Sequence, residues 1–237
     1  MGSLPGALAC ELKSKLGLRR AVETGTFMGG GARALAQIFD NVVTIELAED
    51  LHEQAKEALV DVPNVRLVLG DSRRELRPIA AEHVPTLYWL DGHWSGGATA
   101  GVGDECPVLE ELAALGEGHA DDCILIDDAR LFAAAPPRPH DARHWPALLE
   151  VIDAIRATRP DRHITVLHDL VIAVPNTAKE LVDNFGRQPA SSSPSATALR
   201  RRTAAAGSRL VAAVADVIRR TVRFSRSGRA PARGPSP

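Results

Sequence analysis

A chain of 237 residues, 45% of them apolar and 24% charged, has the length and composition of a soluble globular protein with one α/β domain and a tail. Its three cysteines, Cys10, Cys106 and Cys123, form no CxxC pair and are too few for a disulfide framework, so we expect a reducing, cytoplasmic location. No apolar run reaches the ~18 residues of a membrane span, and the first residues lack the apolar stretch of a secretory signal.

The net charge of −2 is unevenly distributed along the chain. Residues 187–237 contain eleven arginines and one acidic residue, so this segment carries +10 and the first 186 residues carry −12. From Gln188 onward the composition also becomes small, polar and proline-containing, which is typical of a linker. The sequence therefore predicts a folded acidic domain over residues 1–187 and a linker with a basic tail over residues 188–237.

Helical and strand patterns alternate along the predicted domain. Expected helices cover residues 7–18, the stretch from the glycines at 25–31 through about Phe39, and residues 49–60, 72–82, 107–115 and 146–158. Expected strands lie at residues 21–23, 41–45, 65–69, 87–90, 123–126, 164–167 and 171–174. This alternation predicts an α/β, Rossmann-like, doubly wound fold with a mostly parallel seven-stranded sheet. The short gap between the last two strands indicates that the final strand is antiparallel.

A glycine-rich turn follows the first expected strand, in AVETGTFMGGGARAL. Such a strand–turn–helix segment brings backbone close to a ligand at a helix N-terminus, although a tight loop without a ligand has the same composition. The spacing of Gly25, Gly29, Gly30 and Gly31 differs from the G-x-G-x-x-G that seats a dinucleotide pyrophosphate. Glu23 precedes the turn, and an acid there suits a cationic amino-acid group better than a diphosphate.

Two further polar sites follow the next two expected strands. Glu46 ends the second strand, 21 residues after Gly25, where an acid can accept hydrogen bonds from both hydroxyls of a ribose. Asp71 and Ser72 end the third strand, where they can meet an adenine amino group. Glu46 alone could equally be a solvated acid, but the three sites together indicate a nucleoside site at one edge of the sheet.

The motif order ExGxxxGGG, VVTIE, LGDS, LYWLDGH and ILIDD resembles that of class I S-adenosylmethionine (SAM) dependent methyltransferases, over roughly residues 19–176. The resemblance implies SAM as the cofactor. It places Glu46 at the ribose and Asp71 with Ser72 at the adenine. The remaining expected cofactor contacts lie along the methionine part and beside it, at Glu23, Gly25, Thr26, Gly29 and Asp91.

Three acids follow the fourth and fifth strands: Asp91, Asp127 and Asp128. Neighbouring strand ends would bring them into one crevice, where like charges are costly unless a cation is present, and oxygen ligands suit Mg²⁺. The pattern resembles metal-dependent O-methyltransferases of the catechol and macrolide-sugar types, which implies that these acids hold Mg²⁺ against two substrate oxygens. Alternatively, Asp91 caps the next segment and the other two flank a loop.

Methyl transfer to a hydroxyl benefits from a positioned general base. We expect His93, two residues after Asp91, to be that base, with Asp91 as the other catalytic residue; a bound metal would lower the pKa of the hydroxyl. Three rival histidines, His140, His144 and His168, have no feature that distinguishes them.

The glycine-rich loop at residues 94–107 is a candidate lid over the substrate, or an ordinary surface loop. Within it, Glu105 could add a carboxylate to the site. Arg130 could contact an acidic substrate or form a surface ion pair.

Residues 198–224 of the basic tail have an apolar stripe at helical spacing with arginines elsewhere. Contact with an anionic membrane surface, with nucleic acid or with a protein partner, and a disordered tail, all remain open.

These features predict a SAM-dependent methyltransferase that O-methylates a small molecule, such as a sugar or polyhydroxylated metabolite, with Mg²⁺ assistance as an option and a homo-oligomer left open. A nicotinamide-dinucleotide oxidoreductase is disfavoured by the missing G-x-G-x-x-G, and a catalytically idle SAM-binding protein by the three acids. Methylation of nucleic-acid bases is disfavoured because LDGHW stands where a [DN]PP[YF]-like motif is expected.

Overall fold

Seven strands form one sheet in the computed structural model, which describes residues 4–96, 99–101 and 103–187. The strand order is β3-β2-β1-β4-β5-β7-β6. The strands are β1 (Arg20–Thr24), β2 (Val42–Glu46), β3 (Val65–Leu69), β4 (Thr86–Leu90), β5 (Cys123–Ile126), β6 (Arg162–Leu167) and β7 (Leu170–Pro175). The predicted tail at 188–237 and the boundary before it lie outside the described residues.

Only β7 runs against its neighbours, pairing antiparallel with β5 and with β6, while the other pairs are parallel. The cause is local: β6 and β7 are joined by His168 and Asp169, whose φ angles are 50° and 68°. Two successive positive φ values are what a two-residue hairpin turn requires. The predicted mostly parallel sheet with an antiparallel last strand is therefore confirmed.

The six predicted helices are all present. They are α1 (Gly6–Leu16), α2 (Gly30–Ala36), α3 (Glu49–Ala58), α4 (Ser72–Ala80), α5 (Val108–Leu115) and α7 (Leu148–Thr158). Four short elements were not predicted: α6 (Arg130–Ala133), α8 (Lys179–Arg187) and the 3₁₀ turns η1 (Ala142–His144) and η2 (Asn176–Ala178). The apolar pattern of α8 consists of only three residues: Val182 is buried, and Leu181 and Phe185 pack beside it. A pattern this short does not predict a helix.

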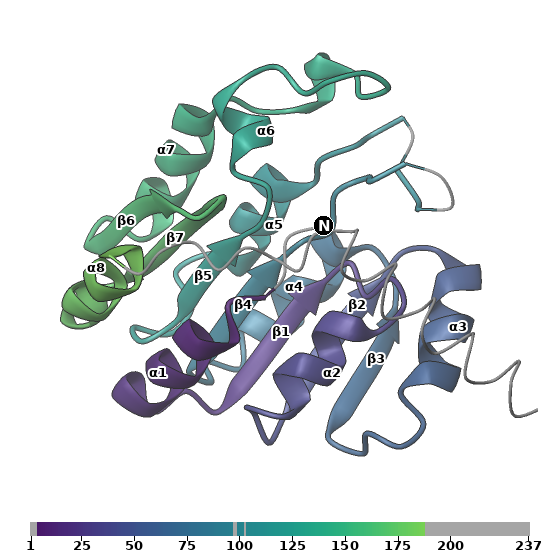
Figure 1. Cartoon of the computed structure of the whole chain (residues 1–237), viewed down its shortest axis with the longest axis horizontal. Helices are drawn as coiled ribbons and strands as arrows, with labels where there is room; N and C mark the ends of the chain where they lie inside the picture. The colour runs from purple at the N-terminus through teal and green to yellow at the C-terminus, as the bar shows by residue number, and fades with distance from the viewer. Residues whose placement is uncertain (1–3, 97–98, 102, 188–237) are drawn as a thin grey trace, which may run out of the picture. The chain divides into compact units, whose positions relative to one another are not determined.

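Helices cover both faces of the sheet (Figure 1). In β4, Tyr88 and Leu90 point into the core beneath α4, α5 and α7, whereas Leu87 and Trp89 point into the core beneath α1, α2 and α8. This alternation follows from the two-residue period of a strand. Each such side chain, when fully buried, adds roughly 1.5–3 kcal/mol to the free energy of unfolding. Because both faces of these strands are buried, their sequences are continuous apolar runs.

The strand order reverses direction between β1 and β4, which lie side by side at the centre of the sheet. In open α/β sheets, ligands bind outside the carboxyl ends of the strands at such a switch point. The glycine-rich turn after β1 and the turn after β4 meet there. In the part of the chain that the structure describes, no helix is both long and apolar enough to cross a lipid bilayer.

Candidate active site

A cavity of about 610 Å³ lies at the carboxyl ends of the central strands. Its walls come from the turns after β1, β2, β3 and β4, from the segment after β5, and from the loop before η1. Of the predicted site residues, those that line it are Gly25, Glu46, Asp71, Ser72, Asp91, His93 and Asp128. The six polar residues among these share one crevice at successive strand ends, as the sequence predicts, and Gly25 lies beside them.

Gly25 sits where the turns after β1 and β4 touch. Its φ is +80°, and a Cβ at this position would lie 2.3 Å from the carbonyl oxygen of Asp91. The Gly25 N–H donates to the carbonyl of Ile45, 2.9 Å away. Only glycine combines this φ with this close approach, so the residue keeps two strand ends in contact beneath the cavity.

Glu46 faces the cavity and also fastens the turn above it. Its two carboxylate oxygens accept hydrogen bonds from the N–H of Phe27 (2.8 Å) and of Ala48 (2.9 Å). Phe27 takes a positive φ of 49° in this turn. Each carboxylate oxygen has a second lone pair, so Glu46 can still accept hydrogen bonds from a ligand.

Asp71 and Ser72 begin α4 on the same wall. Asp71 caps the helix by accepting the N–H of Arg73 (3.0 Å) and pairs with the Arg73 guanidinium at 2.9 Å. These bonds to Arg73 lower the pKa of Asp71 below its ordinary value. Arg73 also pairs with Asp104, so a chain of charged groups that the sequence did not reveal borders this end of the cavity.

Three expected cofactor contacts do not line the cavity: Glu23, Thr26 and Gly29. Glu23 is buried beneath the glycine turn and accepts the Thr44 hydroxyl at 2.6 Å, and that hydroxyl lies 2.7 Å from the one of Thr26. Burial raises the pKa of Glu23 to about 8. A Cβ on Gly29 would touch the side chain of Leu59. These three residues face the strand and helix packing under the turn, and their contact with the cofactor stays a prediction.

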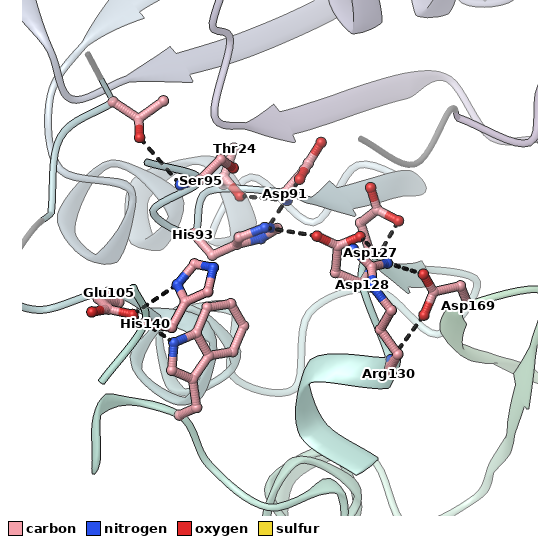
Figure 2. A network of polar contacts seen from close by, with 12 residues as sticks. Thr24, Asp91, His93, Ser95, Glu105, Asp127, Asp128, Arg130, His140 and Asp169 are labelled. Atoms are coloured by element: carbon pink, nitrogen blue, oxygen red, sulfur yellow. Dashed lines mark hydrogen bonds and ion pairs between the residues drawn. The ribbon is translucent and has the colours of Figure 1, made fainter. Parts of the chain in front are cut away.

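His93 lies between two carboxylates, as Figure 2 shows. Its Nε2 is 3.0 Å from Asp128 Oδ2, and its Nδ1 is 3.6 Å from Asp91 Oδ1. Burial alone would lower the pKa of His93, but the hydrogen bond to Asp128 and the charge of Asp91 outweigh it and raise the pKa. Both ring nitrogens of His93 therefore face carboxylates.

The acids around His93 differ in their charge state. Burial, reinforced by the charge of Asp127, raises the pKa of Asp91 to about 7. For Asp128 burial acts in the same direction, but bonds to His93 and Arg130 prevail and lower its pKa to about 2. Arg130 pairs with Asp128 at 2.6 Å and also with Asp169 (Figure 2). The positive charges that balance this cluster are therefore side chains of the protein.

The expected magnesium ligands Asp91, Asp127 and Asp128 have different surroundings, and their binding of a metal stays a prediction. One Asp127 oxygen accepts the N–H of Asp128 at 2.8 Å, and the other is buried without a hydrogen-bond partner among the described residues. Asp127 lines a separate cavity of about 10 Å³ with Glu111. Within residues 4–96, 99–101 and 103–187, no group of three or more His, Cys, Asp or Glu side chains is placed to hold a metal ion. His93 occupies the space between the two acids that do face the cavity.

A second buried cluster borders the cavity beside His93. Glu105 accepts the indole N–H of Trp145 at 2.8 Å and the backbone N–H of Asp141 at 2.9 Å, and lies 3.0 Å from His140 Nδ1. These contacts join residues 35 to 40 positions apart. Sequence reasoning considered Glu105 and His140 separately and had no signal that pairs them.

The sequence matches no protein-family model and no curated protein. The fold, however, is similar to solved methyltransferase structures. An O-methyltransferase from Bacillus cereus in complex with S-adenosylhomocysteine (SAH) is 17% identical, over 73% of this chain and 82% of that chain, with a TM-score of 0.52. The O-methyltransferase of tomaymycin synthesis from Streptomyces achromogenes, in complex with SAM, is 20% identical over 74% of this chain and 82% of that chain, with a TM-score of 0.50.

An SAH-bound methyltransferase from Podospora anserina is 19% identical over 74% of this chain and 79% of that chain, also with a TM-score of 0.50. At such low identity these likenesses concern the fold. They show that this chain has the Rossmann-like fold of SAM-dependent methyltransferases.

Proposed function

We propose that this protein is a SAM-dependent methyltransferase that transfers a methyl group to a hydroxyl of a small molecule, such as a sugar or a polyhydroxylated metabolite. One observation carries the proposal: a single cavity at the switch point joins a nucleoside-type wall to a wall of acids and histidines. The first wall contains Glu46 and Ser72, and the second contains Asp91, His93 and Asp128.

The residues of the first wall suit the nucleoside part of SAM. Glu46 is held in place by two backbone N–H groups, so its free lone pairs are already oriented to accept ribose hydroxyls. The Ser72 hydroxyl lies on the same wall, and Gly25 also lines the cavity, so a ligand there can approach its backbone. When bound, SAM supplies a methyl group on a positively charged sulfur, and the acidic residues around the cavity favour a cation there.

The second wall can stabilise the oxygen that receives the methyl group. A hydroxyl that loses its proton develops negative charge; the Arg130 guanidinium supplies positive charge at this wall, and so does His93 when it is protonated. Asp91 and Asp128 fix His93 from both sides, which prevents it from turning away from the cavity. Positioning of this kind supplies much of the rate in an in-line displacement.

Magnesium assistance stays a prediction of the resemblance. No step of the proposal depends on it, because Asp127 lines a different cavity from Asp91 and Asp128, and His93 lies between the latter two. The cytoplasmic location expected from the cysteines likewise stays a prediction; all three are free. No observation favours the dinucleotide oxidoreductase.

The proposal is tested with SAM labelled in its methyl group. The full chain is incubated with a low-molecular-mass metabolite extract, and products that gain the label are identified by mass spectrometry. We expect at least one hydroxylated compound to be converted to its methyl ether, with SAH formed in equal amount. Label that is transferred only to amino groups, or no transfer at all, would contradict the proposal.

A further inference from the structure

The cluster around Glu105 fixes the protonation of a histidine that opens to the cavity. Glu105 is 2% exposed, and its carboxylate receives N–H groups from Trp145 and Asp141. Burial acts against ionisation, but these hydrogen bonds prevail and lower the pKa of Glu105. An ionised carboxylate only accepts hydrogen bonds. The Nδ1 of His140, 3.0 Å away, must therefore carry the proton and donate it.

This assignment leaves the other ring nitrogen of His140 as the free base. A neutral imidazole with a proton on Nδ1 has its lone pair on Nε2. Among the described residues, Nε2 has no hydrogen-bond partner, and His140 lines the same cavity as Asp91, His93 and Asp128. His93 differs in this respect, because both of its nitrogens face carboxylates.

Two tryptophans hold the His140 ring in this orientation. Its centroid is 5.3 Å from the ring of Trp145 and 5.4 Å from that of Trp94, at interplanar angles of 79° and 82°. The backbone N–H of Trp94 also donates to the backbone carbonyl of Glu105 at 2.7 Å. Edge-to-face packing on both sides restricts rotation of the imidazole. The carboxylate, the ring and the cavity wall therefore form one rigid unit, part of which is visible in Figure 2.

We propose that His140 is the general base for the methyl acceptor and that Glu105 is the positioning residue that fixes its tautomer. The proposal rests on the methyltransferase function above. The acceptor hydroxyl gives its proton to His140 Nε2 while its oxygen bonds to the methyl carbon. The bond from that carbon to sulfur breaks, and its electron pair stays on sulfur. The products are a methyl ether, SAH and a proton that His140 releases to solvent, and the Glu105 carboxylate stabilises the intermediate imidazolium.

His144 provides a matched control from the same cluster. Its Nδ1 lies 3.8 Å from the other carboxylate oxygen of Glu105, but the residue does not line the cavity. It has the same chemistry and the same neighbour as His140, and it differs in access to the acceptor. A substitution at His144 therefore measures what disturbance of the cluster alone does to the protein.

The first experiment reads the tautomer by NMR of the ¹⁵N-histidine-labelled full chain, which needs no substrate. We expect His140 to carry its proton on Nδ1 in the wild type and to populate both tautomers in Glu105→Gln. A wild-type His140 with its proton on Nε2, or a tautomer that does not respond to Glu105→Gln, would overturn the proposal.

The second experiment measures label transfer from SAM to the metabolite extract. We expect His140→Ala to lower turnover by about 10²-fold, with SAM affinity unchanged and partial recovery when imidazole is added. His144→Ala should retain the wild-type rate. If the wild type is active and His140→Ala is equally active, the base assignment is overturned and the methyltransferase function stands. A wild type that transfers no label would overturn the function, and this inference with it.

Discussion

The two walls of the cavity are built differently. The wall formed after β1, β2 and β3 is held by backbone: Glu46 binds two N–H groups of its own and the neighbouring turn, and Gly25 touches the carbonyl of Asp91. The wall formed after β4 and β5 is held by side chains that meet across the fold, as in His93 with Asp128 and Glu105 with His140.

This difference separates binding from chemistry. Backbone contacts resist most substitutions of neighbouring side chains, so the first wall offers a fixed site for the cofactor. Side-chain contacts carry protons and charges, so the second wall can respond to a reaction. Changes in the first wall should therefore weaken cofactor binding, whereas changes in the second should lower turnover more than they lower cofactor affinity.

The largest effect is expected for Gly25→Ala. The new Cβ would lie 2.3 Å from the carbonyl oxygen of Asp91 at a φ of +80°, so the two strand ends must separate. We expect the free energy of unfolding to fall by about 2–4 kcal/mol, with loss of SAM binding, measured by chemical denaturation and calorimetry. Gly30→Ala is the matched control, because nothing lies within 4 Å of its Cβ. If the two variants are equally stable, the contact between the turns is not what holds this wall.

His93→Gln should disrupt the charged contacts of the second wall. The substitution removes the cation between Asp91 and Asp128 and leaves Asp128 with Arg130 as its remaining charged partner in this wall. Removing one partner of a buried ion pair lowers the free energy of unfolding by about 3 kcal/mol. Turnover should also fall more steeply than SAM affinity. A variant with normal turnover and weakened SAM binding would place His93 on the cofactor side and reverse the division between the walls.

Glu23→Gln sharpens the division through pH. The folded-state pKa of Glu23 is about 8, against an ordinary value of 4.5. The neutral acid is therefore favoured in the fold, and wild-type stability declines as pH rises from about 4.5 through 8. We expect Glu23→Gln to melt above the wild type at pH 8 and to match it near pH 4.

Glu57→Gln, an exposed acid on α3, is the control and should show no such pH-dependent gap. A Glu23→Gln variant that is less stable than the wild type at pH 8 would mean that the Glu23 carboxylate is ionised in the fold.

The smallest effect is expected for metal removal. Asp91 and Asp128 already lie beside His93 and Arg130, so we expect exhaustive chelation to leave turnover unchanged, as measured by label transfer before and after dialysis against a chelator. Asp127→Asn should likewise change turnover little. Loss of activity that Mg²⁺ restores would show that the acids rearrange around a metal.

The sequence anticipated the sheet, the antiparallel last strand and the carboxyl-end placement of Glu46, Asp71, Asp91 and Asp128, because strand period and strand ends are local properties. It did not show that Glu23 points beneath the glycine turn, since nothing local shows whether a buried strand residue points beneath a turn or into a cavity.

The sequence did not predict the charge balance at His93 or the pairing of Glu105 with His140. Both depend on contacts between loops far apart in the chain; Glu105 and His140 are 35 residues apart. Helix α8 was missed because its apolar signal spans little more than one turn.

Calorimetric titration of the full chain with SAM and with NADH tests the assignment of the first wall most directly. We expect SAM to bind and NADH not to bind. Glu46→Ala should weaken SAM binding by roughly 1–3 kcal/mol through lost hydrogen bonds to a charged acceptor, and the exposed control Glu57→Ala should bind as the wild type does. Binding of NADH without binding of SAM would contradict the assignment.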